Sequence, residues 1–283
     1  VVLSVPENIK NGLNSDPEKY LVSLTEYLIK GSDDDYLKIK RIHDWITDNI
    51  SYDTDLFCGI GKGSRNTYDI VKLKRTTCGG FSALLKEMAT IAGIECITVS
   101  GISRNYITSK NEASGHAWNA VRIDNKWYIV DSTADGRNGY RNGAFGKKGK
   151  YSSQYLFIKP EAKLLDNFPN DPNLAFTDVN ITKEEYIKNP IYHINTFLYP
   201  EVEFLNVKDI YQKYYVPMEG DNQIRAYDMV KADNNIVTFK LKCPPNVVIT
   251  TTLTDDNDNK YPFNHFSYID SDGMTYCKFS APK

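Results

Sequence analysis

The sequence predicts an α+β protein: a helix-rich start, a mixed core, and an all-β C-terminal part. Apolar residues recur at helical spacing over residues 17–50, and strand-like segments with a tight turn follow over 96–131. Beyond about residue 177 the helical periods vanish, and short strand-like segments alternate with turn residues. Because 283 residues leave room for two domains, we expect one over 1–176 and a second over 177–283.

Three helices are expected in the first domain. The first follows Ser15-Asp16 and covers 17–30, and the second has isoleucines three and four residues apart on one face. The third covers 78–92, with Thr76-Thr77 as its cap and Gly93 as its stop. Its apolar stripe consists of Cys78, Phe81, Leu85, Met88 and Ala92.

Strands are expected after these helices and again in the second domain. In the first domain they cover 96–101, 116–124 and 126–131, with the last two joined at Asp124-Asn125. The segment 136–150 has five Gly and five Lys or Arg, so we expect a mobile loop. Its Lys147–Lys150 run is most simply solvated, although it could border a cleft near Asp131. Strands over 236–241, 247–253 and 274–279 indicate a β-sandwich.

Charge and hydropathy argue against two classes of partner. Lys and Arg number 34 and Asp and Glu number 36, a formal net charge of −2. Without an excess of one sign, we expect no binding to nucleic acid. The apolar runs are only a few residues long, whereas a membrane span needs about 20, so we expect no membrane insertion.

The cysteines are odd in number: Cys58, Cys78, Cys96, Cys243 and Cys277. No pair has C-x-x-C spacing and the four histidines do not cluster with them, so we expect no metal and no other cofactor. If one cysteine is a reactive thiol, the other four could form disulfides in an exported protein or stay buried and free. Because the chain starts at Val1 without Met, the compartment stays open, with a secreted or cell-surface location favoured over the cytoplasm. Nothing in the sequence indicates an oligomeric state.

Cys78 is a candidate nucleophile because it lies at the expected N-terminus of the third helix. A cysteine attacks as its thiolate, and the unpaired N–H groups and dipole of a helix N-terminus stabilise that charge. Gly79 and Gly80 cost helix propensity there, which makes sense if a substrate backbone comes close to the sulfur. The alternative is that Cys78 is a small core residue and that the glycines allow a tight helix crossing.

His116 and Asp131 favour the catalytic interpretation. His116 opens one strand of the expected hairpin, and Asp131 ends the other. With a two-residue turn, Trp118 faces Asp131, and His116 is a diagonal neighbour about 7–8 Å away on the same face. A thiol, a base and an acid that orients the base form the general nucleophile triad. We therefore assign Cys78 as nucleophile, His116 as base and Asp131 as orienter.

The same segments resemble the transglutaminase-like superfamily. The resemblance is carried by CGGFSALL over 78–85, the strand ending at Gly101, GHAWN over 115–119 and KWYIVDST over 126–133. It extends upstream to WITDNISYD over 45–53 and downstream to NFPNDP over 167–172, where relatives usually have a His before Phe-Pro. It covers about residues 20–176 and is most similar to the kyphoscoliosis-peptidase branch.

This resemblance implies a fold and a set of catalytic residues. It implies a papain-like core for 1–176 and an immunoglobulin-like domain for 177–283, which we expect to lack a final strand. The family's Cys, His and Asp fall on Cys78, His116 and Asp131. Members often have Gly-Val where this chain has Thr76-Thr77, a tolerable change because Thr caps a helix well. The spacing identifies no oxyanion donor, for which the backbone N–H of Cys78 is a candidate.

Two classes of function remain. In the first, the thiolate attacks a protein or peptide amide, a thioester forms, and water or an amine resolves it. In the second, the fold is a non-catalytic module that binds a partner protein. The enzyme is favoured because all three residues are present. Transglutaminases shield the thioester with aromatic side chains. Trp118 and Trp127 share the face of His116 but more simply pack the core, so we expect hydrolysis to exceed amine transfer.

Overall fold

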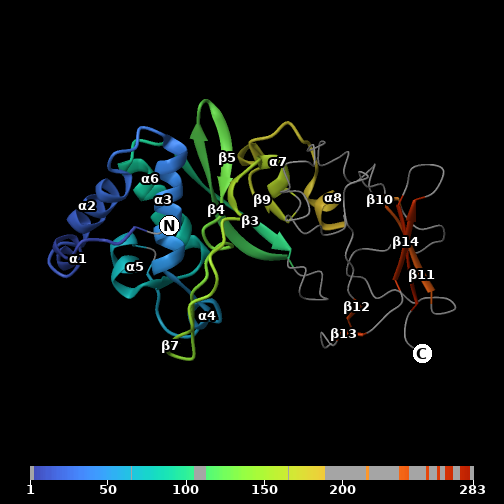
Figure 1. Cartoon of the computed structure of the whole chain (residues 1–283), viewed down its shortest axis with the longest axis horizontal. Helices are drawn as coiled ribbons and strands as arrows, with labels where there is room; N and C mark the ends of the chain where they lie inside the picture. The colour runs from blue at the N-terminus through green and yellow to red at the C-terminus, as the bar shows by residue number, and fades with distance from the viewer. Residues whose placement is uncertain are drawn as a thin grey trace. The chain divides into compact units, whose positions relative to one another are not determined.

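The computed structural model describes residues 3–64, 66–104, 113–164 and 166–188, and beyond them short strands (Figure 1). The chain divides into two compact units. The first comprises Val1–Ser103, Gly115–Lys163 and Asn167–Phe176, and the second comprises Arg104–Ser114, Leu164–Asp166 and Thr177–Lys283.

Helices α1 to α6 lie on one side of the central sheet, and α7 lies on its other side (Figure 1). The helices of the described residues are α1 (Glu7–Lys10), η1 (Asn11–Leu13), α2 (Pro17–Ile29), α3 (Asp35–Asn49), α4 (Thr54–Phe57), α5 (Thr67–Leu73), α6 (Cys78–Ile91), α7 (Pro160–Lys163), η2 (Pro172–Ala175) and α8 (Lys183–Lys188). The caps of the first two long helices explain their start points. Asp16 accepts a hydrogen bond from the N–H of Lys19, and Asp34 accepts one from the N–H of Tyr36.

The core lies where these helices meet the sheet. The expected isoleucines of α3 are fully buried, as are Leu84, Leu85 and Met88 of α6. They form one cluster with apolar residues of α2, α5 and the strands. The amphipathic helices expected from the sequence are therefore confirmed, and their apolar faces supply most of the core.

The central sheet has the strand order β8-β5-β4-β3-β9. Its strands are β3 (Cys96–Arg104), β4 (Ala113–Ile123), β5 (Lys126–Val130), β8 (Leu156–Ile158) and β9 (Asn167–Pro169). In the β4–β5 hairpin Ile123 pairs with Lys126 and Asn119 with Val130. Asp124 and Asn125 both have positive φ, 50° and 60°, as a type I′ turn requires. The two-residue turn and the expected register are confirmed.

A second sheet corrects the expectation of a mobile loop over 136–150. Its order is β2-β1-β6-β7, with β1 (Ser51–Asp53), β2 (Arg75–Thr76), β6 (Gly139–Arg141) and β7 (Ala144–Phe145). The expectation was wrong for 139–145, where Asn142-Gly143, which takes positive φ at both residues, closes a tight hairpin, whereas 136–138 and 146–150 contain no helix or strand. Asp55 holds this turn by accepting from the N–H groups of Asn142 and Gly143, each at 2.8 Å.

In the second unit the described strands are β10 (Tyr215–Val216), β11 (Ile236–Leu241), β12 (Leu253–Thr254), β13 (Lys260–Tyr261), β14 (His265–Ile269) and β15 (Thr275–Ser280). The strand expected over 236–241 is confirmed, and that over 274–279 is shifted by one residue. Most of the strand expected over 247–253 lies outside the described residues. The immunoglobulin-like sandwich stays a prediction. Within the described segments, no helix is long and apolar enough to span a bilayer.

The packing of α6 predicts the effect of a core substitution. Leu85 packs into the core cluster and is fully shielded from solvent, whereas its neighbour Lys86 is exposed to solvent. Leu85→Ala should lower the free energy of unfolding by about 2–5 kcal/mol because it leaves a cavity. Lys86→Ala should change it by less than about 0.5 kcal/mol. Urea denaturation of both variants measures this, and equal effects would contradict the assigned core face.

Candidate active site

Cys78 lies at the first position of α6 with its side chain partly buried. Backbone N–H groups of Ala117 and Gly79 point to its sulfur, and His116 forms a side-chain hydrogen bond with it. Burial alone would raise the pKa of this thiol, but the hydrogen bond and charge of His116 outweigh it, so the pKa is lowered. The site therefore favours a thiolate at Cys78.

The His116 ring connects Cys78 to Asp131. Its Nε2 lies 2.7 Å from Oδ2 of Asp131, which leaves Nδ1 for the thiol. Burial opposes a charged imidazolium, but the charge and hydrogen bond of Asp131 outweigh burial and raise the pKa of His116 to about 9. At neutral pH an imidazolium thus faces a sulfur that favours its thiolate form. The sequence-based expectation that the hairpin brings His116 and Asp131 within reach is confirmed.

Asp131 is almost completely buried, with 1% of its surface exposed. Its Oδ2 also accepts from Nζ of Lys163 at 2.9 Å, and its Oδ1 accepts from the N–H of Ala134 at 3.0 Å. Burial would raise the pKa of this carboxyl, but the charges of Lys163 and His116 outweigh it and hold the pKa far below its usual range. Asp131 is therefore ionised, and its carboxylate contacts two cationic side chains.

Lys163 is the site residue that sequence reasoning missed. It ends the short helix α7, is 3% exposed, and its Nζ lies 4.5 Å from the ring centre of Tyr155 and 5.7 Å from that of Trp118. A lysine in a one-turn helix 32 residues after Asp131 carries no sequence signal for burial. Only the packing of α7 against the sheet brings its ammonium to the carboxylate.

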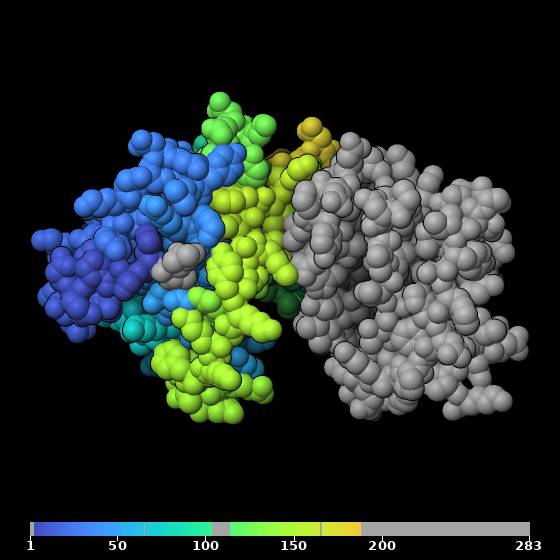
Figure 2. All heavy atoms as spheres, in the orientation of Figure 1, coloured from blue at the N-terminus to red at the C-terminus, as the bar shows by residue number. Residues whose placement is uncertain are grey.

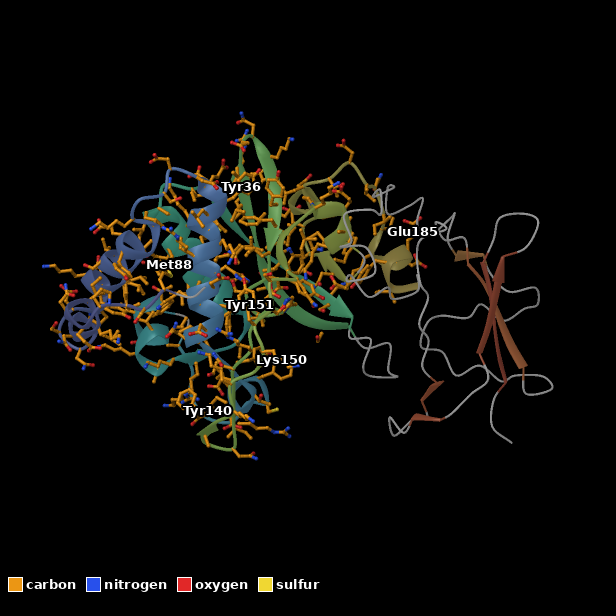
Figure 3. All side chains as sticks on the ribbon, in the orientation of Figure 1. Tyr36, Met88, Tyr140, Lys150, Tyr151 and Glu185 are labelled. Atoms are coloured by element: carbon orange, nitrogen blue, oxygen red, sulfur yellow. The ribbon has the colours of Figure 1, made fainter. Side chains whose placement is uncertain are left out.

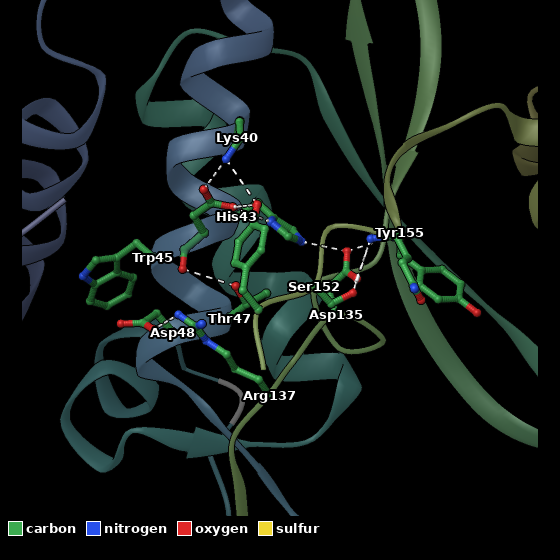
Figure 4. Close-up of polar contacts among 12 residues, drawn as sticks. Lys40, His43, Trp45, Thr47, Asp48, Asp135, Arg137, Ser152 and Tyr155 are labelled. Atoms are coloured by element: carbon green, nitrogen blue, oxygen red, sulfur yellow. Dashed lines mark hydrogen bonds and ion pairs between the residues drawn. The ribbon is translucent and has the colours of Figure 1, made fainter. Parts of the chain in front are cut away.

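A second buried network fixes the turn that follows Asp131 (Figure 4). Nε2 of His43, on α3, lies 3.1 Å from Oδ2 of Asp135, and its Nδ1 lies 3.3 Å from Oδ1 of Asp44. Asp135 also accepts from the N–H groups of Gln154 and Tyr155, at 2.9 and 2.8 Å. Because the N–H of Asp135 donates to the carbonyl of Asp131, this network ties the acid's own turn to α3. His43 has a structural role here, since both ring nitrogens have partners.

The two glycines after Cys78 have different surroundings. A Cβ at Gly80 would collide with the side chain of Thr76, so this glycine allows tight packing. A Cβ at Gly79 would meet no atom within 4 Å, so no described side chain or backbone packs against this glycine. The tight packing considered from the sequence is therefore found at Gly80, and the approach of a substrate beside Gly79 stays a prediction. Thr77 stands at the N-cap position, as expected, but its side chain makes no capping hydrogen bond.

The two indoles near the site differ in position. The Trp118 ring stacks beside the His116 ring, with centroids 5.9 Å apart and planes at 27°, and it is 3% exposed. Trp127 instead packs against Phe176, with ring centroids 4.4 Å apart. Only Trp118 therefore borders the candidate base.

The other described cysteines lack these features. Cys58 is an exposed free thiol, and Cys96 is a buried free thiol whose pKa is raised to about 12 by burial. The side chains of Cys243 and Cys277 lie outside the described residues. Among the described side chains, no group of three or more His, Cys, Asp or Glu could hold a metal ion.

These environments predict an order of thiol reactivity. Cys78 should react with iodoacetamide at neutral pH at least about tenfold faster than Cys58, because its pKa is lowered and thiolate is the reactive form. Cys96 should react only after unfolding. Peptide mapping by mass spectrometry after limited labelling measures all three. Faster labelling of the exposed Cys58 would contradict the proposed nucleophile.

The shared carboxylate predicts how Lys163 influences His116. The charge of Lys163 lowers the pKa of His116, so Lys163→Met should raise that pKa above about 9. Lys163→Arg keeps the charge and should leave it near the native value. An NMR titration of the imidazole, assigned with His116→Gln, gives the values. An unchanged or lower pKa in a folded Lys163→Met variant would show that the ammonium does not act on this pair.

Comparisons with known proteins place these residues in a family. A model of the transglutaminase-like superfamily matches residues 22–132. Kyphoscoliosis peptidase of Mus musculus is 27% identical over 194 residues, which is 67% of this chain and 28% of that protein. The Homo sapiens protein of that name is 28% identical over 182 residues, 62% of this chain and 27% of that protein. The alignments thus span less than a third of these relatives.

A solved structure of a TGase is 17% identical, covers 54% of this chain and 37% of its own, and has a TM-score of 0.33. The family match includes Cys78, His116 and Asp131, and the two peptidase alignments cover most of this chain. This chain therefore carries a transglutaminase-like domain and is related to the kyphoscoliosis-peptidase branch of that superfamily.

Proposed function

We propose that this chain catalyses acyl transfer from protein or peptide amides, with Cys78 as nucleophile, His116 as base and acid, and Asp131 as orienter. The observation that supports it most is the continuous chain of hydrogen bonds from the Cys78 thiol through His116 to Asp131. The lowered pKa of the thiol and the raised pKa of the imidazole are what a thiolate–imidazolium pair requires.

The proposed reaction has two steps. The Cys78 thiolate attacks the amide carbonyl carbon, the C–N bond breaks, and the imidazolium of His116 gives its proton to the leaving amine. Water, deprotonated by the now neutral His116, then attacks the thioester carbonyl, the C–S bond breaks, and the acid and Cys78 are released. We assign the backbone N–H of Cys78 as a donor to the oxyanion. Asp131 keeps the imidazole oriented throughout.

Hydrolysis is proposed as the main outcome rather than transfer to an amine. Amine transfer requires that water be kept from the thioester, which needs apolar walls on more than one side. Trp118 borders His116, whereas Trp127 packs on Phe176.

The acceptor is tested by supplying a peptide substrate and a labelled primary amine together. Peptide cleavage should exceed amine incorporation, and Cys78→Ala should abolish both. Incorporation above hydrolysis would reverse the proposed order. If a broad substrate panel shows no Cys78-dependent turnover, the non-catalytic binding module is the better function.

The pKa values predict the pH dependence. Because the pKa of His116 is raised, its proton is retained to about pH 9, so kcat/KM should fall only above that pH. Asp131→Asn should lower kcat/KM by about 10²–10⁴-fold and move the alkaline limb downward. The double variant Asp131→Asn with Lys163→Met removes both buried charges. An equal loss of kcat/KM in this variant would show that the loss in Asp131→Asn does not come from misfolding around an uncompensated Lys163. An alkaline limb that stays at about 9 without Asp131 would contradict the assigned role.

A further inference from the structure

Two segments near the candidate site contain basic and apolar residues but no acid. Between Asp135 and Glu161 the chain has Arg137, Arg141, Lys147, Lys148, Lys150 and Lys159 and no Asp or Glu. Between Asp55 and Asp69 it has Lys62 and Arg65, again without an acid. Because the whole chain has 36 acids against 34 bases, such one-sided segments give a local positive charge to a protein whose net charge is −2.

The fold joins these two segments into one surface. The β6–β7 turn is bound to α4 through Asp55, so α4 and β7 lie side by side (Figure 1). The space-filling view shows residues 139–150 projecting from the first unit (Figure 2). Three large apolar side chains are exposed here: Phe57 at 57%, Ile60 at 63% and Phe145 at 56%. We call the surface formed by Phe57, Ile60, Lys62, Arg141, Phe145, Lys147 and Lys150 the basic apolar surface.

Its positive charge is only partly compensated. Arg137 and Lys148 both bind the single carboxylate of Asp48, and burial together with the charge of Arg137 lowers the pKa of Lys148. No ion pair in the described part of the chain includes Lys62, Lys147 or Lys150. Figure 3 shows Lys150 between Tyr151 and Tyr140 along the segment that forms this surface.

The surface continues to Cys78 through Tyr52. In the second sheet Tyr52 pairs with Thr76, which precedes Cys78 by two residues. The Tyr52 ring lies 6.1 Å from the Phe57 ring, measured between centroids. Burial, with smaller contributions from Cys78 and Cys58, raises the pKa of Tyr52 to about 12, so Tyr52 lies near both thiols. Tyr52 therefore connects the exposed Phe57 to the candidate nucleophile.

We propose that the basic apolar surface binds an acidic segment of the protein substrate, beside the amide bond that Cys78 attacks. Carboxylates of that segment lie near Lys62, Arg141, Lys147 and Lys150, and its apolar side chains contact Phe57, Ile60 and Phe145. This rests on the proposed function, since it names the substrate class of the same site. A polypeptide is favoured over nucleic acid or lipid because the exposed apolar side chains need apolar partners and because the surface continues to Cys78.

Binding can be tested apart from catalysis. The full chain carrying Cys78→Ala is titrated into a fluorescein-labelled peptide of alternating Glu and Phe, and anisotropy gives its Kd. The peptide should bind at least about tenfold more tightly than the same peptide with Gln in place of Glu, and the preference should shrink as salt is raised. Lys147→Glu combined with Lys150→Glu should weaken binding of the acidic peptide by about tenfold and leave the Gln peptide unaffected.

A matched charge change serves as control. Lys19→Glu with Lys30→Glu alters two exposed lysines at α2 by the same total charge and should not change the Kd. Equal binding of the Glu and Gln peptides, or an equal loss in both double variants, would overturn the proposal. Tighter binding of single-stranded DNA or of anionic vesicles than of the acidic peptide would overturn the choice of partner. All of these binding measurements use the Cys78→Ala chain. Their outcome therefore does not depend on whether the native chain is catalytically active.

Discussion

The arrangement of the candidate site depends on how the buried charge of Asp131 is compensated. A carboxylate removed from water is costly unless cations and N–H groups replace its hydration. Here His116, Lys163 and the N–H of Ala134 do so, each from a different segment of the chain. The β4–β5 hairpin, helix α7 and the turn after β5 must therefore all be in place before the charge is stabilised. Any change that displaces one of them leaves an anion in the core.

Sharing one oxygen of Asp131 between two cations has a chemical consequence. His116 and Lys163 both bind Oδ2 of Asp131. The Lys163 ammonium keeps the carboxylate ionised, and it also reduces the amount by which the pKa of His116 is raised. The remaining influence is still sufficient to raise the pKa of His116 to about 9. Lys163 is thus best described as a positioning residue, because it acts on the thiol only through Asp131 and His116.

Two features outside the site support it. The His43–Asp135 pair attaches the turn after Asp131 to α3. In the second sheet β2 leads to Cys78, and β1 pairs with β2 on one edge and with β6 of the β6–β7 hairpin on the other. The element that positions the nucleophile therefore also positions the surface proposed to bind substrate. A substitution in β1 or at Asp55 should affect both, since they share this framework.

The sequence by itself determined the elements whose signals are local. Helical periodicity marked α2 and α3, and the N-cap Asp16 marked the start of α2. The two-residue turn at Asp124-Asn125 set the register that brings His116 to Asp131, because side chains alternate strictly along a strand. The tertiary structure alone decided the burial of Lys163 and His43, the different roles of Gly79 and Gly80, and the parallel pairing of β6 with β1. These depend on segments tens of residues apart that pack together, and the spacing of residue types within one segment does not encode such contacts.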